Sequence, residues 1–229
     1  MSRDPRWLRR AQSARATMAL ALVCIPAALG AQADSEALSI LEKASVRYER
    51  LTGLCADFRQ TLEVPLLRQT TSAAGEVCQL DPNFFQMRFT DPEGDRIVAD
   101  GTWLWMYLPS AQPGQVIRMQ MAEGSQSIDF HREFLEDPGV KYAPTLVGAE
   151  TVGGVATRHL RLQPLQANTG YSLVDVWLDA AASWIRRIRI EQENGSVRTL
   201  DLDRIRLDPA LSPADFAFDP PPGATVVIR

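Results

Sequence analysis

Short runs of alternating apolar and polar residues constrain the fold of this chain more than any other feature of its sequence. The runs follow one another from residue 53 onward, and each is bounded by Pro, Gly, Asp or Asn. Alternation with a period of two is typical of a strand with one buried face, and the Asp100-Gly101 and Asn194-Gly195 dipeptides favour tight hairpin turns. The pattern predicts a mainly β antiparallel meander of about eleven strands, a number that tends to curl into a barrel or split into a sandwich.

Two segments depart from this alternation and predict helices. Residues 35–52 carry apolar side chains at helical spacing, and Gly53 is placed to end the helix. Residues 125–137 have a similar spacing before Pro138-Gly139, which predicts a short helix, or two turns, that ends there. The apolar residues of this second segment are Ile128, Phe130, Phe134 and Leu135.

The run after Asp100-Gly101 is apolar on both of its faces. One row consists of Trp103, Trp105 and Tyr107, and the other of Leu104, Met106 and Leu108. A sheet with such a strand is covered on both sides, or it keeps part of its apolar surface for a ligand. Alternation alone leaves open which row would face a ligand cavity.

Residues 1–33 have the make-up of a secretory signal, with a basic start, an apolar run over residues 17–30 and a small-x-small pattern at 31–33. We expect cleavage after Ala33 and a single exported domain over residues 34–229. The alternative, a lipidated Cys24, is disfavoured because Val23 stands where lipidation sites have a small residue. Removal of the signal takes five arginines and one aspartate, which moves the net charge from −4 to −8. An acidic domain without a basic stripe disfavours nucleic acid as a partner.

Two cysteines remain in the expected mature chain, Cys55 and Cys78. If residues 55–64 and 72–80 form a hairpin centred near residues 66–67, these cysteines face each other. An even cysteine count in an exported protein then predicts a disulfide. Two unrelated free thiols are the alternative. The same register places Asp57 opposite Glu76, an unfavourable pair that a diagonal Arg59 would offset.

Catalytic chemistry has little support in the sequence. The chain has two histidines, His131 and His159, and neither has the spacing of a metal ligand or stands in a nucleophile motif. We therefore predict that the protein is not an enzyme and has no catalytic residue, no metal site and no cofactor.

Four segments in order resemble the outer-membrane lipoprotein carrier family, the periplasmic LolA proteins. They read LTGLCADFRQTL, GEVCQLDPNFFQMRF, PEGDRIVADGTWLWMYLP and LSPADFAFDPPPGATVV. The resemblance implies an incomplete antiparallel β-barrel of about eleven strands with an N-terminal helix and a helical lid. Its hydrophobic interior would hold the acyl chains of lipoproteins. The carrier would take them from an inner-membrane ABC-type lipoprotein-releasing complex and deliver them to an outer-membrane receptor, and we expect it to act as a monomer.

The resemblance gives candidate residues for this function. The candidate acyl-contacting residues are Phe58, Phe85, Met87, Phe89, Trp105 and Met106. The candidate lid residues are Ile128, Phe130, Phe134 and Leu135. A periplasmic lipid-binding sensor, or a carrier of another lipid, is the alternative hypothesis.

One position departs from the family pattern. Many members carry a basic residue just before the position of Pro82, and it helps to hold the lid over the empty cavity. Here that position is Asp81, which in its ionised form donates no hydrogen bond. Either Arg132 of the lid pairs with Asp81 in a latch of reversed polarity, or the lid of this protein is looser than in the family.

Overall fold

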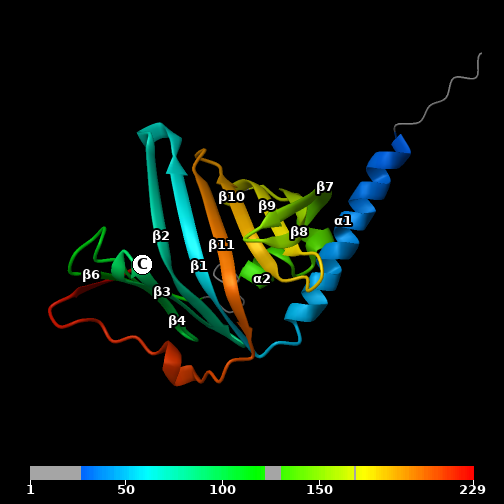
Figure 1. Ribbon diagram of the computed structural model, residues 1–229. Helices are drawn as coiled ribbons and strands as arrows, with labels where there is room; N and C mark the ends of the chain where they lie inside the picture. Colours follow the sequence, from blue (N-terminus) through cyan, green and yellow to red (C-terminus); the bar gives the residue numbers. More distant parts are fainter. Residues whose placement is uncertain (1–26, 122–129, 168) are drawn as a thin grey trace, which may run out of the picture.

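The computed structural model describes residues 27–121, 130–167 and 169–229 (Figure 1). Its helices are α1 (Ala27–Tyr48), η1 (Pro65–Leu67), α2 (Phe130–Phe134), α3 (Pro138–Lys141) and η2 (Pro213–Phe216). Its first six strands are β1 (Gly53–Val64), β2 (Gln69–Leu80), β3 (Phe84–Asp91), β4 (Glu93–Asp100), β5 (Trp103–Tyr107) and β6 (Gln115–Gln120). The others are β7 (Tyr142–Val152), β8 (Val155–Pro164), β9 (Tyr171–Asp179), β10 (Ile185–Gln192), β11 (Val197–Leu207) and β12 (Thr225–Ile228). No helix of the described residues is both long and apolar enough to cross a membrane.

All these strands form one curved sheet in the order β12-β6-β5-β4-β3-β2-β1-β11-β10-β9-β8-β7. Figure 1 shows it bending around α2, with β3, β4 and β6 on one side and β7 to β10 on the other. The predicted open, mainly antiparallel sheet is therefore confirmed, with one difference. The described sheet has 12 strands, because β12 of the C-terminal tail adds to the edge strand β6 in parallel.

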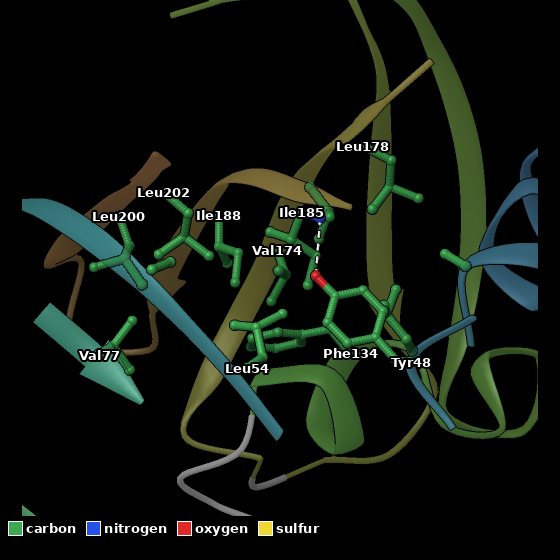
Figure 2. Close-up of a cluster of buried hydrophobic side chains, with 14 of the residues drawn as sticks. Tyr48, Leu54, Val77, Phe134, Val174, Leu178, Ile185, Ile188, Leu200 and Leu202 are labelled. Atoms are coloured by element: carbon green, nitrogen blue, oxygen red, sulfur yellow. Dashed lines mark hydrogen bonds between the residues drawn. The ribbon is translucent and has the colours of Figure 1, made fainter. Parts of the chain in front are cut away.

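The inner face of the sheet, which curves around α2, carries the main hydrophobic core. Figure 2 shows buried side chains of β1, β2, β9, β10 and β11 in one cluster with Tyr48 of α1 and Phe134 of α2. The hydroxyl of Tyr48 accepts a hydrogen bond of 3.0 Å from the backbone N–H of Ile185, which ties the end of α1 to the start of β10. The helices thus fill the hollow side of the sheet.

The outer face is covered on its N-terminal half by a C-terminal strap, which we define as residues 211–224. Phe216 of this strap is fully buried and packs at 5.6 Å from the ring of Phe84. The ring of Phe218 lies 5.7 Å from Trp105 and 6.2 Å from Tyr107. The strap explains why β5 is apolar on both faces, since one row faces the inner core and the other is buried under the strap.

The C-terminal half of the outer face is held by charges instead. Asp175 is buried, and its carboxylate accepts hydrogen bonds of 3.0 Å from Arg161 and 3.4 Å from Arg189. The ring of His159 stacks on Trp177, with 2.8 Å from Nδ1 to Glu150 and 3.1 Å from Nε2 to Asp175. A buried carboxylate needs such partners because its desolvation is costly.

The β1–β2 hairpin has the predicted register. Cys55 lies opposite Cys78, and the two form the predicted disulfide. Asp57 does lie opposite Glu76, but the expectation that Arg59 offsets this pair was wrong. The neighbouring strand β11 supplies the cations instead, as Arg206 contacts both carboxylates and Arg204 pairs with Asp57. Arg204 holds the pKa of Asp57 below its usual range.

Removal of the disulfide should lower the free energy of unfolding by about 3 kcal/mol. The cross-link joins positions 23 residues apart and so reduces the conformational entropy of the unfolded chain. Cys55→Ala combined with Cys78→Ala tests this by urea unfolding of the exported protein. An unchanged midpoint, or two alkylatable thiols in the native parent protein, would contradict the prediction.

The predicted helices differ at their ends. Helix α1 ends at Tyr48 rather than near Gly53, and it begins inside the expected signal, at Ala27. The short helix expected within residues 125–137 ends before Pro138, since α2 ends at Phe134, and a separate helix that was not predicted, α3, begins at Pro138. Proline fits the first turn of a helix because its missing N–H would have no intrahelical partner there.

Candidate functional site

The candidate site is the inner face of β1 to β5 together with the lid, which we define as residues 130–141, from the start of α2 to the end of α3. Phe58, Phe85, Met87 and Phe89 all belong to the main core cluster, and each is at most 9% exposed. The rings of Phe58 and Phe89 meet edge to face at 5.2 Å. Four of the predicted residues therefore form one continuous apolar surface on strands β1 and β3.

The two candidates on β5 lie on opposite faces. Met106 is half-buried and lies opposite Ile97, which packs against the inner core. The prediction that Trp105 faces the cavity was wrong, because it lies in the outer cluster with the disulfide and Phe216. Its indole N–H donates a hydrogen bond of 2.7 Å to Asp100. Adjacent residues of a strand point to opposite faces, so only one of the pair could line the interior.

The lid contributes apolar side chains to the same core cluster. Phe134 and Leu135 are buried in the main core cluster. The ring of Phe134 lies 6.0 Å from Tyr171 and 6.5 Å from Tyr142. Ile128 and the side chain of Phe130, which were also predicted for the lid, lie outside the described residues.

A polar anchor that the sequence did not reveal fixes the end of α2. Tyr171 donates a short hydrogen bond to the carboxylate of Glu133, and Tyr142 donates one of 3.0 Å to the backbone carbonyl of the same residue. Lys141 donates one of 2.6 Å to the carbonyl of Arg132. Burial raises the pKa of both tyrosines. These hydroxyls therefore remain protonated donors, which a lid anchor at Glu133 requires.

The other side of α2 carries the predicted ion pair. Arg132 Nη2 lies 3.5 Å from Asp81 Oδ1, and the two side chains are 31% and 56% exposed. The pairing is confirmed, and its role as a latch stays a prediction. A pair this exposed contributes no more than about 1 kcal/mol. The polar anchor at Glu133 is thus more protected from solvent than the ion pair with Asp81.

His131 lies between these two attachments, packed on the end of α1. Its ring stacks on Tyr48 with the centroids 4.8 Å apart and the planes at 11°. Tyr48 also meets Trp184 edge to face at 5.2 Å. Burial lowers the pKa of His131 to about 4. The folded lid therefore holds this imidazole in its neutral form.

The free energy of unfolding should fall as the pH is lowered from 6.5 to about 4, the range between the unfolded and folded pKa values of His131. Its pKa of about 4 in the fold lies below the ordinary value of 6.5, so the unfolded chain binds more protons between these values. We expect a loss of up to about 3 kcal/mol from pH 6.5 to pH 4. His131→Phe keeps a ring on Tyr48 and removes the titration. Urea unfolding at both pH values should show a shallower pH dependence in this variant, and an identical dependence would refute the assignment.

The sequence matches a known family model over most of its length. The family model described as "Outer membrane lipoprotein carrier protein LolA" matches residues 49–219, from the end of α1 to the C-terminal strap. The chain belongs to the LolA family. It is 24% identical over 185 residues to a protein of Shewanella sediminis named "Outer-membrane lipoprotein carrier protein", covering 80% of this chain and 81% of that one. A protein of the same name from Neisseria gonorrhoeae is 23% identical over 176 residues, covering 76% and 80%.

A solved structure supports the fold of this LolA-family protein. The crystal structure of an uncharacterized conserved protein from Thermus thermophilus matches with a TM-score of 0.53 at 17% sequence identity. The match covers 85% of this chain and 98% of that chain. At this identity the likeness concerns the architecture alone.

Proposed function

We propose that this protein is a periplasmic carrier that binds the acyl chains of lipoproteins between the inner face of its sheet and its lid. The observation that carries the proposal is a broad apolar surface, from Phe58 to Phe89, that belongs to the same core cluster as Phe134 and Leu135 of the lid. Membership in the LolA family and the names of its relatives support the same function. The role is one of binding and transport, without catalysis.

The closed interior bears on how such a carrier releases its cargo. Burial of one methylene contributes about 0.8 kcal/mol, so a fully buried sixteen-carbon chain would gain on the order of 12 kcal/mol. Several chains bound this way would dissociate too slowly for transport. In this fold Phe134 and Leu135 already occupy the inner face. An entering acyl chain has to displace them, and their return on release offsets much of the gain.

The proposed route connects two membranes. The carrier would accept lipoproteins from an inner-membrane ABC-type releasing complex and deliver them to an outer-membrane receptor, acting as a monomer. Native mass spectrometry of the exported protein tests the cargo. Bound acylated proteins or peptides would support the proposal, whereas free phospholipid as the sole ligand would favour a sensor or a carrier of another lipid.

Met87→Gln tests where the acyl chains bind. Met87 lies in the middle of the inner face of β3, with Val77 and Ile97 opposite it on the two neighbouring strands. A glutamine there should lower the affinity for a fluorescent fatty acid at least ~10-fold per folded molecule, because a polar group faces the acyl chain. It should also cost about 2 kcal/mol of stability.

Arg88→Gln is the matched control, since Arg88 is the next residue of β3 and is exposed. It should leave both binding and stability close to the parent protein. If Met87→Gln binds the probe like the parent once the folded fraction is accounted for, this surface is an ordinary core and not a binding site.

A further inference from the structure

The β1–β2 hairpin extends past β3, its neighbour on one side, while β11 on the other side pairs with β1 as far as Glu63. Its pairing continues to Val64 and Gln69, whereas β3 pairs with β2 only from Ala74 onward. The five residues 69–73 therefore pass beyond β3 by about 17 Å at the usual rise per residue. Figure 1 shows the tip of β1 and β2 standing clear of β3 and β4.

Two leucines occupy this tip, within the single turn of η1. Leu66 is 83% exposed and Leu67 is 67% exposed, and no residue of η1 is buried. The turn is closed by the backbone of Arg68, which adopts a left-handed conformation and donates its N–H to the carbonyl of Pro65. The leucine side chains take no part in forming this turn, which polar residues would form equally well.

The charge of the tip differs from that of the rest of the chain. Acidic residues exceed basic residues by four overall, yet residues 64–75 contain one ionisable side chain, that of Arg68. The nearest acid along β1 is Glu63, which lies beside β11 opposite Val197, behind the turn. The tip therefore exposes two leucines and the cation of Arg68, whereas Glu63 lies within β1, before the turn.

We infer that this tip touches a lipid bilayer surface, with Leu66 and Leu67 entering the interface and Arg68 facing anionic headgroups. A bilayer fits better than a protein partner because the tip is only a few residues wide. A stable protein interface needs about 800 Å² from each side. Adjacent leucines beside a cation suit the headgroup boundary, where apolar area and positive charge both contribute to binding. The contact is weak and reversible, as two side chains alone cannot anchor a protein.

The inference deepens the proposed function and rests on it for its purpose, since a carrier that exchanges acyl chains with membrane partners benefits from brief contact with their membranes. The tip lies at the far end of β1 and β2 from the latch at Asp81, which follows β2. Membrane contact and acyl binding are therefore separable by substitution.

Flotation of the exported protein with vesicles tests the inference. The vesicles contain phosphatidylethanolamine and phosphatidylglycerol, with pure phosphatidylcholine as the uncharged comparison. We expect weak binding that Leu66→Gln combined with Leu67→Gln reduces at least ~10-fold. Arg68→Gln should reduce binding to anionic vesicles alone. Ile228→Gln is the matched control, because Ile228 is 64% exposed at the edge of the sheet, and it should leave binding unchanged.

Failure of the parent protein to float at millimolar lipid, or equal flotation of the double variant, would overturn the inference. Fatty-acid binding measured on the same variants is independent of this result. The double variant should bind the fatty acid like the parent, with an unchanged melting temperature. If the parent protein floats with the vesicles but does not bind the fatty acid, the proposed function is contradicted and the inferred membrane contact is still supported.

Discussion

A covalent tether between the lid and the sheet at the latch is expected to block acyl uptake. In Asp81→Cys combined with Arg132→Cys, the two thiols replace side chains whose charged ends meet at 3.5 Å, and a bis-maleimide bridges the wider gap that the shorter cysteine side chains leave. With α2 held at both Glu133 and residue 132, the lid has no free side from which Phe134 and Leu135 could leave the inner face. We expect uptake of a fluorescent fatty acid to fall at least ~100-fold.

The same double variant treated with a single-headed maleimide is the control, because it carries the modification without the cross-link. It should take up the fatty acid at least as fast as the parent, since it has lost the Arg132–Asp81 pair. Equal uptake in tethered and untethered protein would show that acyl chains enter without movement of α2, and the latch would then have no role.

The strands and hairpins of this fold could be predicted because residues close together in the sequence determine them. The register of the first hairpin follows from the turn at residues 65–67, and this register alone brings Cys55 opposite Cys78. The pairing of Asp81 with Arg132 was also predicted, but from the resemblance, because Asp81 stands where many family members carry a basic residue and Arg132 is the one arginine of the lid segment.

Other features depend on contacts that a pattern in one segment does not contain. The side of β5 that faces inward had no sign in the sequence, because both rows are apolar and the strap that covers Trp105 lies more than one hundred residues away. The anchor of Glu133 on Tyr171 joins residues 38 apart in sequence. An acidic residue on an otherwise apolar helical face was the one available signal for it.

The strand β12 was missed for a related reason. It has four residues, shorter than an ordinary strand signal, and it joins β6 in parallel. Parallel pairing of distant segments leaves no turn motif between them, because the connection is long. The position of this strand is set by the strap before it, whose buried Phe216 fixes the tail on the outer face.

Phe216→Ala should therefore lower the free energy of unfolding by about 4 kcal/mol, the cost of removing a fully buried aromatic ring. For a domain of this size the melting temperature should fall by roughly 10 °C. The loss comes from two sources, since the cavity lies beside Phe84 and the strap no longer shields the outer cluster with Val98 and the disulfide. Thermal unfolding followed by circular dichroism gives the measurement.

Val226→Ala is the control in the same tail, because Val226 is 38% exposed and should change stability by no more than about 0.5 kcal/mol. The decisive comparison is with ligand binding. Phe216 and Trp105 share the outer cluster, on the face of the sheet opposite Phe58 and Met87. Phe216→Ala should therefore bind a fatty acid with parent affinity per folded molecule at 25 °C, whereas Met87→Gln should not. Weakened binding in both variants would mean that the acyl site includes the outer face, and Trp105 would return as a candidate ligand contact.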